Sequence, residues 1–576
     1  MIEFLSGNEA IARGAFEAGV RVATAYPGTP STEILENIAK YDGIQAQWSP
    51  NEKVALEVAI GASLAGARAL VAMKHVGLNV AADPLMTISY VGPKGGLVVI
   101  SADDPGMHSS QNEQDNRYYA KFAGVPMLEP SDSQEAKDFV RSAFEISSEF
   151  ATPVLVRMTT RVCHSKGVVR LGETCNSPSM GYEKDVRKNV MVPAHARLRH
   201  LALEERRKRL EEYAERSPLN RTQMGDHSLG IITSGVAYQY SKEVFPDASF
   251  LKLGLTNPIP KGIIQRFAEK VARILVIEEL EPFLEEQIRA LGIEVVGKER
   301  IPRVGELSPD TIRSAILSSV AYSENPSSSL PARPPVLCPG CPHRGVFYVL
   351  RKLKFTVTGD IGCYTLAALP PLNAMDTCIC MGASIGAALG MEKALGPEIS
   401  GKTVAVIGDS TFIHSGITGL IDAVYNRSNI TIIILDNNTT AMTGHQDHPG
   451  TGRTLKGEPT VSLDLEALAR AVGLRSVRIV DPYDLDATEK AIREEVLKDR
   501  PSVIIARHPC VLLTKERYPT PKVDTEVCTG CKLCLRLGCP AISISEGKAE
   551  VDPFLCNGCG ICAQVCRVHA MISGRT

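Results

Sequence analysis

The chain has 576 residues, a net charge of −2 and a hydrophobic content of 44%. This length predicts several domains, and the near-neutral charge excludes the basic field that a nucleic-acid-binding surface needs. No apolar run reaches the roughly 18–20 residues that a membrane span requires, and the first residues lack the basic-then-apolar order of a signal peptide. We therefore expect a cytoplasmic protein, in which sixteen cysteines favour metal or redox chemistry over disulfides.

The first 165 residues alternate between amphipathic helices and short apolar runs. A helix is predicted to begin at Ser6 or Asn8 and to end before Gly19. Four apolar runs have the character of buried parallel strands: VRVATAY, ALVAM, GLVVIS and TPVLVRM. This alternation is typical of a doubly wound α/β domain, which we assign to residues 1–165.

Two further segments lead to the middle of the chain. Residues 166–225 contain the charged stretch LEERRKRLEEYAERSP, which predicts a solvated connecting helix. Strand patterns return at LGIITSG, SFLKLGL and ARILVIEE, so residues 226–325 are predicted to form a smaller α/β domain. The Pro- and Ser-rich run NPSSSLPARPPV (325–336) is typical of a linker.

A third α/β domain is predicted for residues 337–515, with strands at TVAVIG, ITIIILD and SVIIAR. After a second Pro-containing linker (518–526), a cysteine-rich module occupies residues 520–576. The fold class is therefore a multidomain α/β protein with a small cysteine-rich domain at its end.

The cysteine-rich module contains two runs of C-x2-C-x2-C, a spacing that wraps three thiolates around one iron–sulfur cubane. The module resembles bacterial-type two-cluster ferredoxins, in which the fourth cysteine of each run serves the other cluster. This resemblance implies two [4Fe–4S] clusters, and it implies their ligands: Cys528, Cys531, Cys534 and Cys566 for the first, and Cys556, Cys559, Cys562 and Cys539 for the second. The chain departs from the ferredoxin pattern at two positions. Four residues precede Cys539 where three are usual, and Arg567 follows Cys566 where proline is usual.

The third α/β domain carries a pattern that resembles the thiamine diphosphate motif, GDG followed by NN. One strand ends in Gly408-Asp409-Ser410, where Ser410 replaces the usual glycine, and another ends about 28 residues later at Asn437. Mg²⁺ prefers octahedral oxygen ligands and shares them with a diphosphate. We predict Asp409, the side chain of Asn437 and the carbonyl of Thr439 as its ligands, with Asn438 as the alternative amide.

Small residues near Gly382, in MGASIGAALG, would let a helix approach that cofactor closely. Thiamine enzymes also need a glutamate against the aminopyrimidine ring. Glu52, which heads a helix rich in small residues, fits this role better than Glu57, one turn later. Taken alone, Glu52 is better explained as a first-turn carboxylate that favours the helix dipole.

Several motifs along the whole chain carry a wider resemblance. In order they are YPGTPSTE, NEKVALE, MKHVGLN, LCPGCPHRG, DIGCYTL, GDSTFIHSG, LDNNTTAMTGHQDHPG and the two-cluster module. The chain resembles the large (alpha) subunits of the indolepyruvate ferredoxin oxidoreductases, within the 2-oxoacid:ferredoxin oxidoreductase family. The resemblance implies two thiamine-binding domains and, between them, a transketolase C-terminal-like domain.

The same resemblance implies an oxidoreductase that converts an aryl 2-oxo acid and coenzyme A into an acyl-CoA and CO2, with electrons leaving to ferredoxin. It also implies a smaller beta subunit encoded separately and a hetero-oligomer such as α2β2, with no nucleic acid or membrane as partner. Other 2-oxo acids, or a non-oxidative thiamine-dependent decarboxylase, remain alternatives.

The resemblance also assigns individual side chains. It implies that Thr29 meets the 2-oxo acid and that Arg117 meets its carboxylate, against the alternatives of a turn residue and an ion pair. Lys74 and His75 follow a strand end, where catalytic side chains of α/β sheets gather.

Two histidines and a cysteine loop in the third α/β domain are further candidates. His445 and His448 are candidates for proton transfer, and we favour His445 as the nearer to the magnesium ligands. Cys341 belongs to a C-x2-C loop that we expect to pack around the cofactor; zinc or a third cluster, with Cys363, Cys378 and Cys380 as extra ligands, is the alternative.

Overall fold

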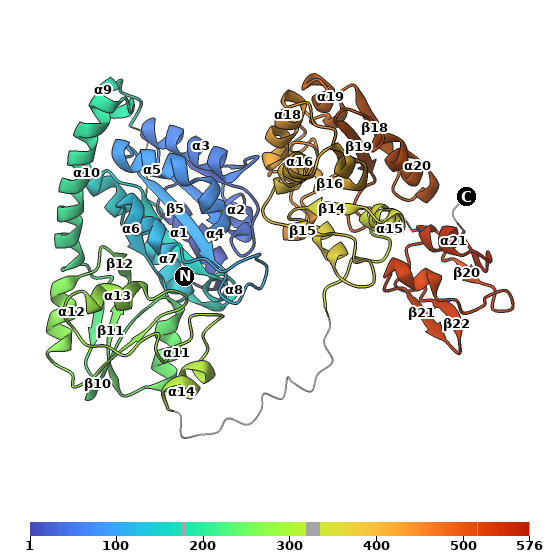
Figure 1. Cartoon of the computed structure of the whole chain (residues 1–576). Coiled ribbons are helices and arrows are strands. Elements are labelled where there is room, and N and C mark those ends of the chain that lie inside the picture. The colour runs from blue at the N-terminus through green and yellow to red at the C-terminus, as the bar shows by residue number, and fades with distance from the viewer. Residues whose placement is uncertain (176–179, 318–333, 515–516, 575–576) are drawn as a thin grey trace. The chain divides into compact units, whose positions relative to one another are not determined.

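The computed structural model describes residues 1–175, 180–317, 334–514 and 517–574. The chain divides into two compact units, Met1–Ser329 and Leu330–Thr576 (Figure 1). The linker expected at 325–336 lies outside the described residues except for its last three. Among the helices that the structure describes, none is both long and apolar enough to cross a membrane.

A seven-stranded sheet lies at the centre of the first unit, with strand order β12-β6-β7-β5-β4-β2-β3. Its strands are β2 (Val22–Ala25), β3 (Gln45–Trp48), β4 (Ala69–Lys74), β5 (Leu97–Asp103), β6 (Met127–Leu128), β7 (Val154–Thr159) and β12 (Leu255–Asn257). All neighbours are parallel except β12 against β6. Every residue of β4, β5 and β7 is buried, which explains their apolar sequences. The four strands expected in this region are confirmed.

Helices connect these strands: α1 (Gly7–Glu17), α2 (Thr32–Ile38), α3 (Glu52–Leu64), α4 (His75–Val80), α5 (Ala82–Val91), α6 (Arg117–Ala123), α7 (Ser133–Phe150) and α8 (Thr160–His164). Helix α1 begins with a capping box, in which Ser6 and Glu9 satisfy each other's backbone N–H groups. It ends before Gly19, whose φ of +69° is the left-handed conformation typical of a helix end. A separate antiparallel ribbon pairs β1 (Ile2–Ser6) with β8 (Lys166–Arg170).

The expected connecting segment contains α9 (Val186–Asn189) and the 22-residue helix α10 (Pro193–Ala214). It leads to a four-stranded sheet of β9 (Arg221–Gln223), β10 (Asp226–Ser234), β11 (Ala248–Leu253) and β13 (Ile274–Ile277), in the order β13-β10-β11-β9. Its helices are α11 (Val236–Val244), α12 (Lys261–Ala268), α13 (Phe283–Arg289) and α14 (Pro309–Ile316). Strand β12 leaves this sheet for the edge of the larger one, and residues of both sheets, such as Leu155 and Leu251, form a single hydrophobic core.

The second unit is built on a six-stranded, fully parallel sheet with strand order β15-β14-β16-β17-β19-β18. The strands are β14 (Thr356–Gly359), β15 (Thr377–Cys378), β16 (Thr403–Gly408), β17 (Thr431–Asp436), β18 (Ser476–Val480) and β19 (Ser502–Arg507). The helices are α15 (His343–Leu353), α16 (Ala383–Leu395), α17 (Asp409–Thr411), α18 (Ile417–Tyr425), α19 (Leu465–Ala471) and α20 (Leu485–Glu495). The three strands predicted here are confirmed as β16, β17 and β19.

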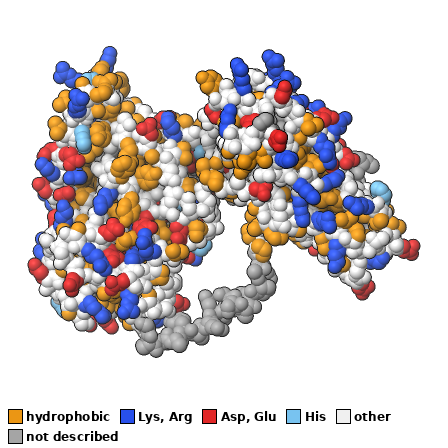
Figure 2. Space-filling view, in the orientation of Figure 1, with side chains coloured by type: hydrophobic (Ala, Val, Ile, Leu, Met, Phe, Trp, Pro, Cys, Tyr) orange, Lys and Arg blue, Asp and Glu red, His pale blue; other side chains and the backbone are white. Residues whose placement is uncertain are grey.

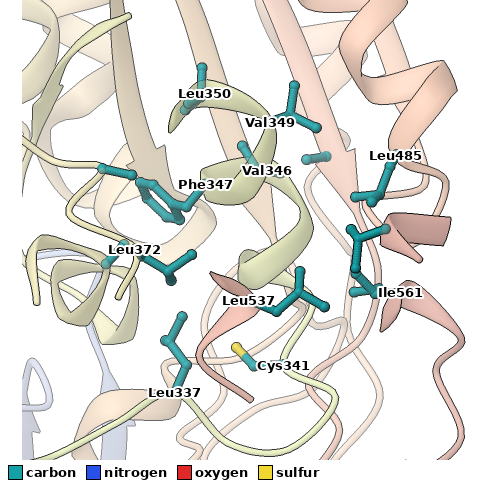
Figure 3. Close-up of a cluster of buried hydrophobic side chains, with 14 of the residues drawn as sticks. Leu337, Cys341, Val346, Phe347, Val349, Leu350, Leu372, Leu485, Leu537 and Ile561 are labelled. Atoms are coloured by element: carbon teal, nitrogen blue, oxygen red, sulfur yellow. The ribbon is translucent and has the colours of Figure 1, made fainter. Parts of the chain in front are cut away.

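The cysteine-rich module completes the second unit. It contains two short antiparallel pairs, β20 (Lys522–Val523) with β23 (Met571–Ile572) and β21 (Ile542–Ser545) with β22 (Lys548–Val551), and the helix α21 (Ile561–Val565). One hydrophobic core joins this module to the sheet domain: Leu537 and Ile561 lie near α15 beside Leu485 and Cys341 (Figure 3). The module is therefore packed on the sheet domain rather than tethered to it. On the visible face, basic and acidic side chains are interspersed (Figure 2).

Candidate functional site

The predicted magnesium ligands come together at the carboxyl ends of β16 and β17. These strands are parallel neighbours, with Gly408 opposite Leu435, so Asp409 and Asn437 emerge at the same edge of the sheet. Asp409 is buried, and its Oδ1 and Oδ2 accept hydrogen bonds of 2.8 Å from the backbone N–H groups of Ser410 and Asn438. One terminal atom of the Asn437 amide lies 3.2 Å from Asp409 Oδ1 and 2.9 Å from the carbonyl oxygen of Thr439.

The Asn437 amide can take either of two orientations in this arrangement. With its NH2 group between the two oxygens, Asn437 donates a hydrogen bond to each of them. Rotated by half a turn, it presents a third oxygen to Asp409 and Thr439. Mg²⁺ binds oxygen at about 2.0–2.1 Å in octahedral geometry, which separates adjacent ligand oxygens by about 3 Å. The observed spacings match that separation, so these three groups fit a magnesium ion.

Two histidines lie close to Asp409. His448 is buried, its Nε2 is 3.4 Å from Asp409 Oδ2, and its Nδ1 accepts a hydrogen bond from the N–H of Gly450. His343 is also buried; burial lowers its pKa to about 4, and the charge of Asp409 opposes that shift. His445 instead has its Nε2 3.8 Å from the Cys510 sulfur. The expectation that His445 lies nearest the ligands is therefore corrected, because it is His448 that contacts Asp409.

A buried polar group supports the backbone at Gly408. Asp360 accepts hydrogen bonds from the hydroxyl groups of Tyr364 and Ser384, and burial raises its pKa to about 6. A Cβ atom on Gly408 would lie 2.8 Å from the Tyr364 ring, so this position has room only for glycine. Gly382 has φ +83° at the start of α16, and a Cβ there would lie 2.7 Å from Ser415 Oγ. The sequence analysis quoted Asp360 as the first residue of the DIGCYTL motif but gave it no role.

The C-x2-C loop lies among other cysteines. Burial, together with the neighbouring thiols of Cys363 and Cys338, raises the pKa of Cys341 to about 12. Burial also raises the pKa of Cys510, as do the charges of Cys338 and Asp409. Cys338, Cys341, Cys363 and Cys510 thus lie within electrostatic reach of one another. Cys510, for which the sequence analysis made no prediction, belongs to this group, and we call these four residues the loop cysteines.

In the first unit, Glu52 is the first residue of α3 and is buried, with Asn51 capping the helix through Val54 N–H. Its carboxylate lies directly over helix α4. A Cβ atom on Gly77 would be 2.5 Å from Glu52 Oε1 and 2.7 Å from its Cγ. Glycine at position 77 therefore sets the position of the Glu52 carboxylate.

Thr29 is half-buried in the loop after β2, beside the end of β4. Its carbonyl accepts a hydrogen bond from Ser109 Oγ. Lys74 Nζ donates to the carbonyl and the hydroxyl of Ser109 and lies 4.0 Å from Asp104. Burial lowers the pKa of Lys74 to about 8, and the charge of Asp104 opposes that shift. Thr29 and Lys74 are thus linked through Ser109.

Arg117 has a different environment from the one predicted. It is fully buried, and its guanidinium forms ion pairs with Asp115 and Glu278 and donates to the carbonyl oxygens of Glu279 and Glu281. These partners bind it between the two sheets of the first unit. The prediction that Arg117 meets a substrate carboxylate is corrected, because its charge is already neutralised and it has no exposed surface.

The cysteine-rich module contains two cavities. The first cysteine cavity is lined by Cys528, Cys531, Cys534 and Cys566, and the second by Cys539, Cys556, Cys559 and Cys562. Among the described residues, no three histidine, cysteine or carboxylate side chains lie close enough together to hold a single metal ion. A multi-iron cluster differs, because each thiolate binds a different iron and the four stay apart around a shared space. Each cavity therefore fits the cysteine set predicted for one cluster.

Three family models match the chain. They are the thiamine-binding model of pyruvate flavodoxin/ferredoxin oxidoreductases over residues 13–215, the C-terminal TPP binding domain of thiamine pyrophosphate enzymes over residues 360–506, and a 4Fe-4S binding domain over residues 549–572. Together with the parallel sheets and the cysteine cavities, they define the class: a thiamine-binding oxidoreductase chain with an iron–sulfur module.

Relatives along nearly the whole chain narrow this class. The chain is 42% identical to indolepyruvate oxidoreductase subunit IorA of Archaeoglobus fulgidus, covering 98% of this chain and 96% of that one. It is 44% identical to the subunit of the same name from Pyrococcus horikoshii, covering 98% and 95%. The corresponding subunit of Methanothermobacter thermautotrophicus is 42% identical, covering 99% and 97%. The chain belongs to the indolepyruvate oxidoreductase subunit IorA family.

Proposed function

We propose that this chain is the catalytic subunit of an indolepyruvate:ferredoxin oxidoreductase. One aryl 2-oxo acid and one coenzyme A give one acyl-CoA, one CO2, one proton and two electrons, which two ferredoxins accept singly. The observation that carries this proposal is the packing of a two-cavity cysteine module directly on a thiamine-type sheet domain through one hydrophobic core. A decarboxylase that makes an aldehyde has no use for such a module, because it releases no electrons.

Thiamine diphosphate, when bound, supplies the nucleophilic carbon and the electron sink on which a 2-oxo acid loses CO2. In this chain, Asp409, Asn437 and the Thr439 carbonyl would hold Mg²⁺ and, through it, the diphosphate. A second carboxylate, Asp436, lies near Asp409. Burial raises the pKa of Asp436, and the nearby negative charge of Asp409 raises it as well. A divalent cation would relieve this repulsion. His448, whose Nε2 lies 3.4 Å from Asp409 Oδ2, would face the same carboxylate.

Glu52 is proposed as the carboxylate that meets the aminopyrimidine ring. It is the first residue of a helix, it is buried, and its carboxylate packs against Gly77. A buried carboxylate in a fixed position can exchange a proton with a ring nitrogen without losing its orientation. Its structural role as a first-turn helix residue is compatible with this function.

Thr29 and Lys74 are proposed to bind the 2-oxo acid. With Arg117 committed to Asp115 and Glu278, Lys74 is the cation linked to the Thr29 loop. The ion pair between Lys74 and Asp104 is long, at 4.0 Å, and the Asp104 carboxylate also accepts hydrogen bonds from Ser109, Ser110 and Thr160. Lys74 is therefore proposed to meet the substrate carboxylate, and the Thr29 hydroxyl to meet the 2-oxo group.

Electrons are proposed to leave through two [4Fe–4S] clusters, one in each cysteine cavity. The loop cysteines are the candidate ligands for the alternative that the C-x2-C loop holds metal, although no three of them lie close enough together, among the described residues, for a single metal ion. Iron analysis separates these possibilities: eight irons per chain correspond to two clusters, and about twelve would place a third at Cys338, Cys341, Cys363 and Cys510.

The stoichiometry of the reaction supports two of the partners, and the name of the relatives, which are subunits, supports the third. We propose ferredoxin as the electron acceptor, coenzyme A as the second substrate, and a separate smaller beta subunit that joins this chain in a hetero-oligomer such as α2β2. The reduced thiols that iron–sulfur assembly needs favour a cytoplasmic location.

An anaerobic assay of this chain with its partner subunit tests the proposal. Reduction of viologen or ferredoxin should require both an aryl 2-oxo acid and coenzyme A, and indolepyruvate should exceed pyruvate in kcat/KM. Release of an aldehyde without electron transfer would favour the non-oxidative decarboxylase. A preference for pyruvate over every arylpyruvate would instead favour another 2-oxo acid oxidoreductase.

A further inference from the structure

Arg344, on the first turn of α15, is a buried cation without an anionic partner. It is 2% exposed, and no carboxylate among the described residues forms an ion pair with it. Its NH1 group donates to the Leu537 carbonyl at 2.5 Å, and its NH2 group donates to the carbonyls of Leu337 and Cys338 at 2.7 and 3.1 Å. Its Nε has no hydrogen-bond acceptor within the described part of the chain.

Such a residue is unfavourable in isolation. Moving a charge from water into a protein interior costs several kcal/mol unless an opposite charge compensates it. Backbone carbonyls offset part of this cost, but they carry no net charge. Two other buried arginines, Arg117 and Arg157, form ion pairs with buried carboxylates. A third, Arg206, is buried with a hydrogen bond to the Ser89 carbonyl, and burial lowers its pKa to about 10. A negative charge that is not an amino-acid side chain is therefore inferred for Arg344 from what lies beside it, and not from its burial alone.

The position of Arg344 identifies that charge. Together with Pro339 and Gly340, it lines the second cysteine cavity, beside Cys539, Cys556, Cys559 and Cys562. Four thiolates around a [4Fe–4S] core give a net charge of −2 when the cluster is oxidised and −3 when one electron has been added. The cations at the first cysteine cavity are less buried: Lys532, in its lining, is exposed to solvent, which screens its charge, and Lys548, which donates to the Cys528 carbonyl, is half-buried.

We propose that Arg344 is the counter-charge of the second iron–sulfur cluster and raises its reduction potential above the value the cluster would have without it. This inference rests on the two-cluster part of the proposed function. Adding one electron makes the cluster more negative, so a fixed positive charge stabilises the reduced form more than the oxidised form. No proton needs to accompany the electron, because the positive charge of Arg344 is already present before the cluster is reduced.

Arg344 also links the sheet domain to the second cysteine cavity. It donates on one side to the Leu337 and Cys338 carbonyls of the sheet domain and on the other to the Leu537 carbonyl, two residues before Cys539. Gln564 of the cysteine-rich module adds a second link, because it accepts a hydrogen bond from the N–H of Leu485 and donates one to the Tyr483 carbonyl. The second cavity thus borders the sheet domain, whereas the first is lined by residues of the cysteine-rich module.

The test is an EPR-monitored redox titration of the full chain with its partner subunit. In Arg344→Met, the signal of one cluster should move to lower potential while that of the other stays unchanged and serves as an internal reference. Arg344→Lys keeps the charge and should lie closer to the wild type. Arg351→Met is the matched control, since Arg351 is exposed on the same helix and donates to a backbone carbonyl; it should shift neither potential.

Several results would overturn the assignment. Unchanged potentials in Arg344→Met, with full iron content, would remove any electrostatic role. Equal shifts in the Lys and Met variants would show that charge is not the cause, and loss of iron in both would assign a structural role. Loss of about four irons in Arg344→Met alone supports the counter-charge. Iron content of the wild type is measured first, so a wrong cluster count fails there and not in the variants.

Discussion

Substitution of Gly77 by alanine tests the position of Glu52 without altering Glu52 itself. An alanine Cβ would lie 2.5 Å from the carboxylate oxygen, whereas ordinary contacts of this kind are about 3.5 Å. The carboxylate must therefore move by about 1 Å. A displacement of this size at a reacting group costs roughly 100-fold in rate, equivalent to about 2.7 kcal/mol. Alanine itself favours the helix, so α4 should still form.

The assay is the anaerobic 2-oxo acid- and coenzyme A-dependent reduction of viologen, with melting temperature and thiamine diphosphate affinity measured in parallel. We expect Gly77→Ala to lose about 100-fold in kcat while both other quantities change little. Gly61→Ala is the matched control, because it lies in the same helix as Glu52 and a Cβ there meets nothing within 4 Å. Wild-type kcat in Gly77→Ala would refute the catalytic position of Glu52.

Three further predictions concern other parts of the chain. Lys74→Met should raise KM for the 2-oxo acid by about 10–100-fold, as expected for a lost charged hydrogen bond. It should also abolish the preference of the enzyme for arylalkanoate inhibitors over their neutral amides. An unchanged preference would exclude Lys74 as the residue that binds the substrate carboxylate. Burial raises the pKa of Glu279 to about 7, so the stabilising effect of the protonated side chain is complete below about pH 4.5 and is lost as pH rises through 7. Glu279→Gln should therefore flatten the fall in melting temperature between pH 5 and 7.5. A fall parallel to that of the wild type would contradict this. Cys539→Ser should perturb the cluster whose potential depends on Arg344, and Cys566→Ser the other one, so the reverse pairing would refute the exchange of fourth ligands.

The features that were predictable from the sequence depend on local patterns. Asp409 and Asn437 each follow an apolar strand, and parallel neighbours bring such strand ends together without any further information. Three cysteines of each run likewise line one cavity through their short spacing, and the fourth comes from the other run. The helix start at Glu52 was predictable because helix starts and small-residue helices have recognisable sequences.

The features that were not predictable depend on partners far away in the chain. Arg117 resembled a substrate ligand because Glu278, which neutralises it, comes about 160 residues later. Cys510 reaches the site because β19 pairs with β17, which brings its N–H to the Asn437 carbonyl. Arg344 is part of an ordinary helix in the sequence; its missing counter-charge is visible only when Leu537 and the second cysteine cavity are in place.

The central claim is that electrons released in the thiamine domain enter the clusters of the same chain. A single-turnover experiment with rapid freezing and EPR tests it most directly, with this chain and its partner subunit, one equivalent of indolepyruvate, excess coenzyme A and no ferredoxin. Two electrons per 2-oxo acid should appear as reduced [4Fe–4S] signal, and Glu52→Gln should give none. Consumption of the 2-oxo acid with clusters that stay oxidised would contradict the account.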